Sequence, residues 1–122
     1  MSHRILIADP HDQMRAVIRS VFEKVGWDVV AEAADGQEAV DKSQNYNPDL
    51  VVLEMIMPLK NGVDAAAEIR KTRPATKLLM FTIHDSDAVR NAVLRAGLDG
   101  YVVKSAPSAA LLAEAQRVLS EV

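Results

Sequence analysis

The sequence predicts an α/β protein with a doubly wound parallel sheet, and two features of the chain lead to this prediction. Five short apolar runs recur along the 122 residues, and each run is continuous, as in parallel strands that are buried on both faces. A helical pattern of apolar residues follows each run, so strand and helix alternate five times. Crossovers of this length favour parallel strands with helices on both faces of the sheet.

The predicted strands are aliphatic, because aromatic residues make up only 4% of the chain. Taken in order, the runs are Ile5-Leu6-Ile7-Ala8, Val29-Val30-Ala31, Leu50-Val51-Val52-Leu53, Leu78-Leu79-Met80-Phe81 and Tyr101-Val102-Val103. All are far shorter than the roughly 20 apolar residues that cross a bilayer, and the first is too short for the core of a signal peptide. We therefore expect no membrane segment.

The predicted helices carry apolar residues at spacings of three and four. In order, these stripes are Met14, Val17, Ile18, Val21, Phe22 and Val25; a less regular segment from about Gln37 to Tyr46; Val63, Ala66 and Ile69; Ala88, Val89, Ala92, Val93 and Ala96; and Leu111, Leu112, Ala115, Val118, Leu119 and Val122. The chain ends with the last of these helices, so the pattern predicts a single domain over residues 1–122.

Residues at the ends of the stripes agree with this assignment. Gly26 and Gly97 follow two stripes, as glycines that cap helix C-termini do. Asp12 and Ser86 stand where N-caps are expected. Pro107 suits the first turn of the last helix, where its missing N–H costs nothing.

Composition narrows the classes of function. The apolar content of 49% is that of a globular protein with a real core, and a formal charge of −3 gives no basic surface for nucleic acid. Cysteine is absent from the sequence, which excludes disulfides and thiolate metal sites and fits a reducing compartment, so we expect a cytoplasmic protein.

Polar residues directly follow the apolar runs, and those after the first, third, fourth and fifth runs form one set. They are Asp9, Glu54, Thr82 and Lys104. Ligands of open α/β sheets bind outside the carboxyl ends of the strands, so these side chains are expected at one edge. Carboxylates hold Mg²⁺, while a hydroxyl and an ammonium bind phosphoryl oxygens. The set therefore predicts a site for a divalent cation and a phosphoryl group.

The motifs around these residues resemble the receiver domain of bacterial two-component response regulators, over essentially the whole chain. The resemblance lies in Ile5-Leu6-Ile7-Ala8-Asp9, Pro48-Asp49-Leu50-Val51-Val52-Leu53, Met57-Pro58, Asn61-Gly62, Phe81-Thr82 and Gly100-Tyr101-Val102-Val103-Lys104. Ala34-Asp35-Gly36-Gln37-Glu38-Ala39 also resembles regulators that carry a C-terminal helix-turn-helix domain. The resemblance implies a flavodoxin-like fold of five helices and five parallel strands in the order 2-1-3-4-5.

The resemblance also implies roles for individual residues. Asp9 matches the first of the family's acidic pair at the Mg²⁺ site, Glu54 matches the phospho-acceptor, and the Ile56 carbonyl matches a backbone metal ligand. Thr82 matches the switch hydroxyl, and Lys104 matches the lysine that pairs with the phosphoryl group.

Tyr101 matches the aromatic switch of the same family. The implied partners are a sensor histidine kinase or another signalling protein. A homodimer contact is implied on the face of the fourth helix, fifth strand and fifth helix. A domain of this kind binds neither nucleic acid nor membrane and has no catalytic residues that would make it an enzyme.

Two departures from the family pattern alter the expected chemistry. Glu54 is one methylene longer than the family's Asp, and displacement of about 1 Å can cost on the order of a hundredfold in rate. Pro10 stands where the second acid is expected and offers no carboxylate to Mg²⁺. Asp12 is close enough in sequence to compensate, although the N-cap role is favoured. Ser105 replaces the proline that usually follows the lysine in a cis bond.

These departures favour a pseudo-receiver, or a receiver biased toward its active conformation, with weak Mg²⁺ binding at most. In this hypothesis a Glu54–Lys104 pair, expected near the surface and worth about 0–1 kcal/mol, partly replaces the phosphate contacts. One alternative is an ordinary phosphorylatable receiver, truncated from a DNA-binding transcription factor, in which Glu54 is an engineered or drifted change.

A Mg²⁺-dependent phosphoryl-transfer enzyme is an alternative from another class. A haloacid-dehalogenase-type phosphatase needs a second acid two residues after the first, where this chain has His11. A flavin or nucleotide carrier needs a phosphate loop rich in Gly, Ser or Thr after the first strand, and residues 9–13 provide none of these.

Overall fold

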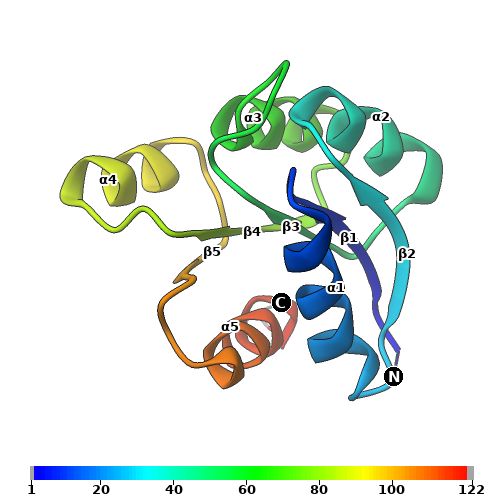
Figure 1. Cartoon of the computed structure of the whole chain (residues 1–122). Coiled ribbons are helices and arrows are strands. Elements are labelled where there is room, and N and C mark those ends of the chain that lie inside the picture. Colours follow the sequence, from blue (N-terminus) through cyan, green and yellow to red (C-terminus); the bar gives the residue numbers. More distant parts are fainter. Residues whose placement is uncertain (1, 121–122) are drawn as a thin grey trace.

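The five aliphatic runs form the strands of one parallel sheet in the computed structural model, which describes residues 2–120 (Figure 1). Within that range the strands are β1 (Arg4–Ala8), β2 (Asp28–Ala33), β3 (Leu50–Leu53), β4 (Lys77–Thr82) and β5 (Gly100–Val103). Their order across the sheet is β2-β1-β3-β4-β5, and every neighbouring pair is parallel. The predicted flavodoxin-like sheet and its strand order are therefore confirmed.

A helix follows each strand, as the alternating pattern predicts. These helices are α1 (Asp12–Glu23), α2 (Gly36–Tyr46), α3 (Gly62–Thr72), α4 (Asp87–Arg95) and α5 (Ser108–Ser120). Helices α1 and α5 cover one face of the sheet and α2 and α3 cover the other, while α4 stands beside the β4–β5 edge (Figure 1). None of the helices in the described range is long and apolar enough to cross a membrane.

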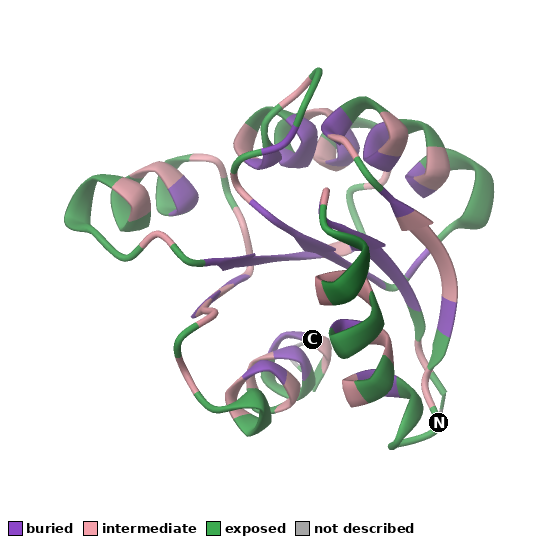
Figure 2. Ribbon diagram, in the orientation of Figure 1, coloured by how far each residue is buried: buried purple, intermediate pink, exposed green. Residues whose placement is uncertain are grey.

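The core consists of two apolar layers, one on each face of the sheet. Strands β1 and β3 contribute to both layers because alternate side chains point to opposite faces, and both strands are buried along nearly their whole length (Figure 2). Two residues of the predicted first stripe lie outside this core. Val17 is 52% exposed, because Ile18 and Phe22 already fill the buried face of α1, and Val25 follows the helix. The predicted stripe residue Val122 lies outside the described residues.

The predicted helix ends are correct in part. Gly26 and Gly97 adopt positive φ angles of 82° and 76°, and the Ser86 hydroxyl accepts the Val89 N–H at 3.2 Å. The N-cap predicted at Asp12 is wrong. Asp12 is the first helical residue and His11 is the N-cap, because Asp9 accepts the His11 N–H and the helix begins one residue earlier than predicted.

The predicted start of the last helix is displaced by one residue. Helix α5 begins at Ser108, and the Pro107 carbonyl accepts the Ala110 N–H at 2.8 Å. Pro107 therefore occupies the position before the first turn.

The N-caps of α2 and α3 were not predicted. Asp35 and Asn61 supply them, accepting the backbone N–H of the residue three positions on at 2.7 and 2.8 Å.

A bulge in β2 decides which way one charged residue points. Ile5 of β1 pairs with Val29, but Leu6 pairs with Ala31, so Val30 is an extra residue on the outer strand. Because side chains alternate along a strand, this insertion places Ala31 on the face of α2 and α3 and Glu32 on the face of α1. Glu32 thereby reaches the arginines of α1.

The loop between β3 and α3, which borders the predicted site, is held against its neighbours by two glycines. A Cβ on Gly36 would lie 1.8 Å from the Lys60 carbonyl oxygen, and one on Gly62 would lie 2.2 Å from the Glu54 carbonyl oxygen. The Gly62 N–H also donates to Met55 at 2.7 Å. This close backbone contact fixes the path of the chain immediately after Glu54.

Candidate functional site at the carboxyl edge of the sheet

Three of the four predicted strand-end residues meet in one cluster of charges. The Lys104 Nζ lies 2.7 Å from Asp9 Oδ2 and 2.7 Å from Glu54 Oε1. The side chains of Lys104, Asp9 and Glu54 are 7%, 2% and 6% exposed. The Glu54–Lys104 pair was expected near the surface, and that expectation is wrong, because the surrounding strand ends and loops cover it.

Backbone bonds that continue the sheet for one residue place these side chains. The N–H of Glu54 donates to the Ala8 carbonyl at 2.9 Å, and the N–H of Lys104 donates to the Thr82 carbonyl at 2.8 Å. The N–H of Asp9 likewise donates to Ala33 at 3.0 Å. Each charged residue is therefore anchored by main-chain bonds to the neighbouring strand.

The remaining carboxylate oxygens are also occupied. Asp9 Oδ1 accepts the His11 backbone N–H at 2.9 Å and lies 3.1 Å from the His11 Nδ1. Glu54 Oε2 accepts the Met55 N–H at 2.5 Å, so this longer side chain folds back onto its own loop. Each of the four carboxylate oxygens thus accepts a hydrogen bond from a donor within the chain.

The two carboxylates keep Lys104 charged in spite of its burial. Burial by itself lowers the pKa of the Lys104 ammonium, but the hydrogen bonds to Asp9 and Glu54 outweigh it and leave that pKa above its usual value. The site therefore contains two acids and one cation, so removal of Lys104 would leave both carboxylates buried without a cation, whereas removal of one acid leaves a balanced pair.

Thr82 and Tyr101 point to the loop before α4 rather than to this cluster. The buried Thr82 hydroxyl accepts the His84 N–H at 3.3 Å, and the Tyr101 hydroxyl donates to the His84 carbonyl at 2.5 Å. Burial raises the pKa of the Tyr101 phenol, and the Arg90 guanidinium lies 5.5 Å from the ring centre. The last residue of β4 and Tyr101 of β5 thus hold one residue of this loop at both its N–H and its carbonyl.

Few other residues offer ligands to a metal ion at this edge. Ile56 lies in the β3–α3 loop, and because its side chain is a hydrocarbon, only its carbonyl could serve as a ligand. Pro10 has no side-chain donor, and the carboxylate of Asp12 is 90% exposed and paired with Arg15. Residues 2–120 contain no group of three or more His, Asp or Glu side chains arranged to hold a metal ion.

Sequence reasoning missed two residues that touch the cluster. His11 contacts Asp9 through its ring, and Arg15 donates to the Asp9 carbonyl at 2.6 Å. The spacing of Asp12 and Arg15, one turn apart on a helix, is a signal that could have indicated the ion pair between them. It could not indicate that the same guanidinium reaches the end of β1.

Ser105 follows Lys104 in place of the family's proline, and the Lys104–Ser105 peptide bond is trans.

A doubly wound sheet of this order, with two acids and a lysine joined at its carboxyl edge, defines the signalling class to which the sequence motifs pointed. The family model of the response regulator receiver domain matches residues 5–116, and the chain belongs to this family of two-component signalling proteins.

Individual relatives agree with the family assignment. The chain is 35% identical over 104 residues to the chemotaxis protein CheY of Thermotoga maritima, which covers 85% of this chain and 87% of that protein. It is 33% identical over 119 residues to the transcriptional regulatory protein DegU of Brevibacillus brevis, covering 97% of this chain but 50% of DegU. A crystal structure of a LuxR-family two-component response regulator from Aurantimonas sp. SI85-9A1 superposes with a TM-score of 0.94, at 35% identity, over 98% of this chain and 86% of that one.

We predict that Lys104→Met destabilises the protein by about 3–5 kcal/mol, because it leaves the carboxylates of Asp9 and Glu54 buried without a cation. Urea denaturation at pH 7 measures this loss. Lys71→Met, on the exposed surface of α3, is the control and should change stability by less than about 0.5 kcal/mol. Adding Glu54→Gln to Lys104→Met should recover part of the loss. Equal stability of Lys104→Met and the control Lys71→Met would contradict the prediction.

We also predict how the Lys104 contribution depends on pH. Its pKa is higher in the folded protein than in the unfolded chain, so the stabilisation is complete below the unfolded value of about 10.4 and is lost as the pH rises through the folded value. The stability difference between the parent protein and Lys104→Met should therefore stay constant from about pH 7 to pH 10 and shrink at higher pH. A difference that already shrinks between pH 7 and pH 9 would argue against a charged Lys104.

Proposed function

We propose that this chain is an atypical receiver domain of a phosphorelay, in which Glu54 stands at the phospho-acceptor position and phosphorylation is weak or absent. The observation that carries this proposal is the pairing of Lys104 with both Glu54 and Asp9. In the family pattern this lysine pairs with the phosphoryl group. Here its ammonium is already engaged by two carboxylates of the same chain.

The position of Glu54 gives a second reason for weak phosphorylation. Its Oε1 accepts from Lys104 and its Oε2 accepts from Met55, so both oxygens are held toward donors of the same chain. A nucleophile must reach a near-attack distance of about 3–3.5 Å in the correct direction, and these bonds restrict the turning of the side chain toward a phosphorus atom.

The donor set also fits Mg²⁺ poorly. Receiver domains generally bind Mg²⁺ at the phosphorylation site. Mg²⁺ requires near-octahedral geometry and usually takes one or two carboxylates, and here Pro10 supplies none while both acids are committed to Lys104. We propose that Mg²⁺ binding through Asp9, Glu54 and the Ile56 carbonyl is weak, and we assign no step to the ion.

The Glu54–Lys104 pair provides a basis for a conformational bias. In this proposal the pair partly substitutes for the contacts of a phosphoryl group, and Thr82 and Tyr101 act as the switch residues. Their common contact with His84 supports a coupled movement, since a change at either side chain has to move the same loop. A bias of one to two kcal/mol changes the ratio of two states by about 5–30-fold.

The partner surface is proposed on α4, β5 and α5. Leu94 of α4 is 73% exposed, and a hollow of about 470 Å³ lies beside Tyr101, Arg90, Ala110 and Arg117. Receiver domains interact with sensor histidine kinases and other signalling proteins. We propose such a protein, or a second copy of this chain, as the occupant of this face.

The extent of the domain, its location in the cell and its lack of enzymatic activity are also proposals. We propose a single receiver domain over residues 1–122, acting in the cytoplasm without enzymatic turnover and without binding nucleic acid. The Mg²⁺-dependent phosphoryl-transfer enzyme is not favoured, because the family is a signalling family. The truncated, ordinarily phosphorylated receiver is less favoured too, because Pro10 and Glu54 both depart from the pattern that phosphorylation needs.

We predict that incubation with Mg²⁺ and acetyl phosphate leaves the intact mass unchanged, because Glu54 is held by Lys104 and Met55. Intact-protein mass spectrometry measures the gain of a phosphoryl group. The double variant Pro10→Asp with Glu54→Asp serves as the positive control and should gain one. A stoichiometric gain by the parent protein that disappears in Glu54→Ala would overturn the proposal.

A further prediction separates the contributions of the two departures. Glu54→Asp alone should leave Mg²⁺ affinity low, while Glu54→Asp combined with Pro10→Asp should restore tight binding, because Mg²⁺ needs the second carboxylate. Isothermal titration calorimetry of the two variants measures this difference. If the single variant binds as tightly as the double one, Pro10 is not the defect.

A further inference from the structure

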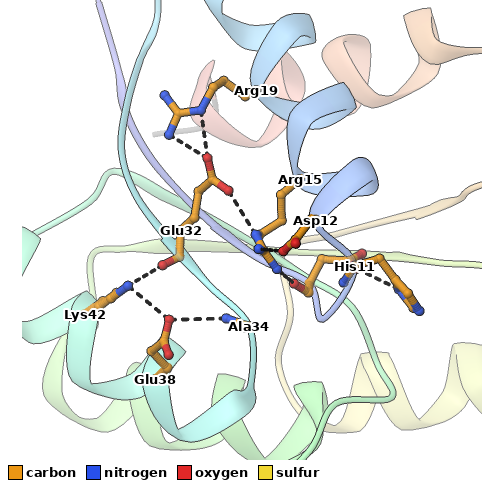
Figure 3. Close-up of polar contacts among 9 residues, drawn as sticks. His11, Asp12, Arg15, Arg19, Glu32, Ala34, Glu38 and Lys42 are labelled. Carbon is orange, nitrogen blue, oxygen red and sulfur yellow. Dashed lines mark hydrogen bonds and ion pairs between the residues drawn. The ribbon is translucent and has the colours of Figure 1, made fainter.

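Arg15 connects three elements of the fold at the border of the site. Its side chain extends from the first turn of α1 and is 14% exposed. Nη1 donates to the Asp9 carbonyl at 2.6 Å, Nε donates to Glu32 Oε1 at 2.9 Å, and Nη2 contacts the Asp12 carboxylate (Figure 3). One guanidinium therefore joins the end of β1 to the edge strand β2.

Asp9 is bonded at every polar atom, and Arg15 supplies the contact at its carbonyl. The N–H donates to Ala33, Oδ1 accepts from His11, and Oδ2 accepts from Lys104. Because Pro10 follows, the next residue offers no N–H to help fix this turn of the chain. The planar guanidinium, with several donors in a rigid fork, fixes the direction of the Asp9 carbonyl and so of its peptide.

Glu32 is itself held in place by other residues, so its carboxylate is a fixed acceptor for the Arg15 guanidinium. Its Oε2 accepts from Arg19 at 2.8 Å, and its carbonyl accepts from Lys42 of α2 at 2.5 Å. Burial tends to raise the pKa of the Glu32 carboxyl, but the bonds from Arg19 and Arg15 outweigh it and hold that pKa below its usual value. The bulge at Val30 aims this charged side chain at α1.

We propose that Arg15 is a positioning residue of the carboxylate cluster. It fixes the main chain at Asp9 so that Oδ2 faces Lys104. Its second bond, to Glu32, joins the Asp9 main chain to β2. It also pairs with the Asp12 carboxylate, which is exposed to solvent. The inference rests on the geometry of the cluster, and it holds whether or not Glu54 accepts a phosphoryl group.

The test compares Arg15→Met with Arg19→Met. Both variants remove one positive charge from α1 and one partner of Glu32, but only Arg15 contacts Asp9. The readout is the reactivity of the Lys104 amine toward trace acetic anhydride, measured by peptide mass spectrometry against the exposed Lys71. A buried, doubly paired amine reacts slowly, so loosening of Asp9 should raise the labelling of Lys104.

We expect Arg15→Met to raise Lys104 labelling about tenfold, a factor that corresponds to about 1.4 kcal/mol. Arg19→Met should change it by less than about twofold. An unchanged rate in Arg15→Met, or an equal rise in both variants, would overturn the proposal.

General unfolding also exposes Lys104, and amide hydrogen exchange distinguishes this effect. Val51 and Val52 lie in the fully buried strand β3 and report global opening. Positioning by Arg15 predicts that Lys104 labelling rises more than exchange at these amides. If both rise by the same factor in Arg15→Met, the residue acts on overall stability and the proposal fails.

Discussion

The ammonium of Lys104 between Asp9 and Glu54 is the interaction on which the carboxyl edge of this protein depends. Strands β1 and β3 are neighbours and carry the two acids, and β5 carries the cation from the far edge of the sheet. The order 2-1-3-4-5, in which all strands are parallel, places these three strand ends at the same edge of the sheet. Because all three side chains are almost fully buried, both carboxylates depend on the single ammonium of Lys104 for compensation of their charge.

The apolar core of the fold does not include the charged residues of the carboxyl edge. The two apolar layers on β1 and β3 are complete without any contribution from Pro10 or Glu54, so the sheet forms whatever chemistry its edge retains. The site is then assembled from strand ends whose positions are already fixed. Glu54 and Pro10 lie at the edge of the sheet, while the path of the backbone is that of the family.

Much of the fold could be predicted from the sequence, and the errors have definite causes. Continuous apolar runs identified all five strands because both faces of the sheet are covered. Asp12 failed as an N-cap because Asp9 competes for the local backbone, and Val17 failed as a core residue because Ile18 and Phe22 fill the buried face of α1. These outcomes depend on competition between neighbours, which a pattern of residue types does not contain.

The sequence by itself determined the alternation of strands and helices and the residues at the strand ends, since periodicity is a local property of the chain. The strand order and the departures at Glu54 and Pro10 were implied by the resemblance to receiver domains. The tertiary structure decided the burial of the Glu54–Lys104 pair and the reach of Arg15 from α1 to the Asp9 carbonyl. It also decided the orientation of Glu32, because the bulge at Val30 exists only in the pairing of β1 with β2. Packing across the sheet sets the distances between the side chains of Arg15 and Glu32 and between those of Glu54 and Lys104.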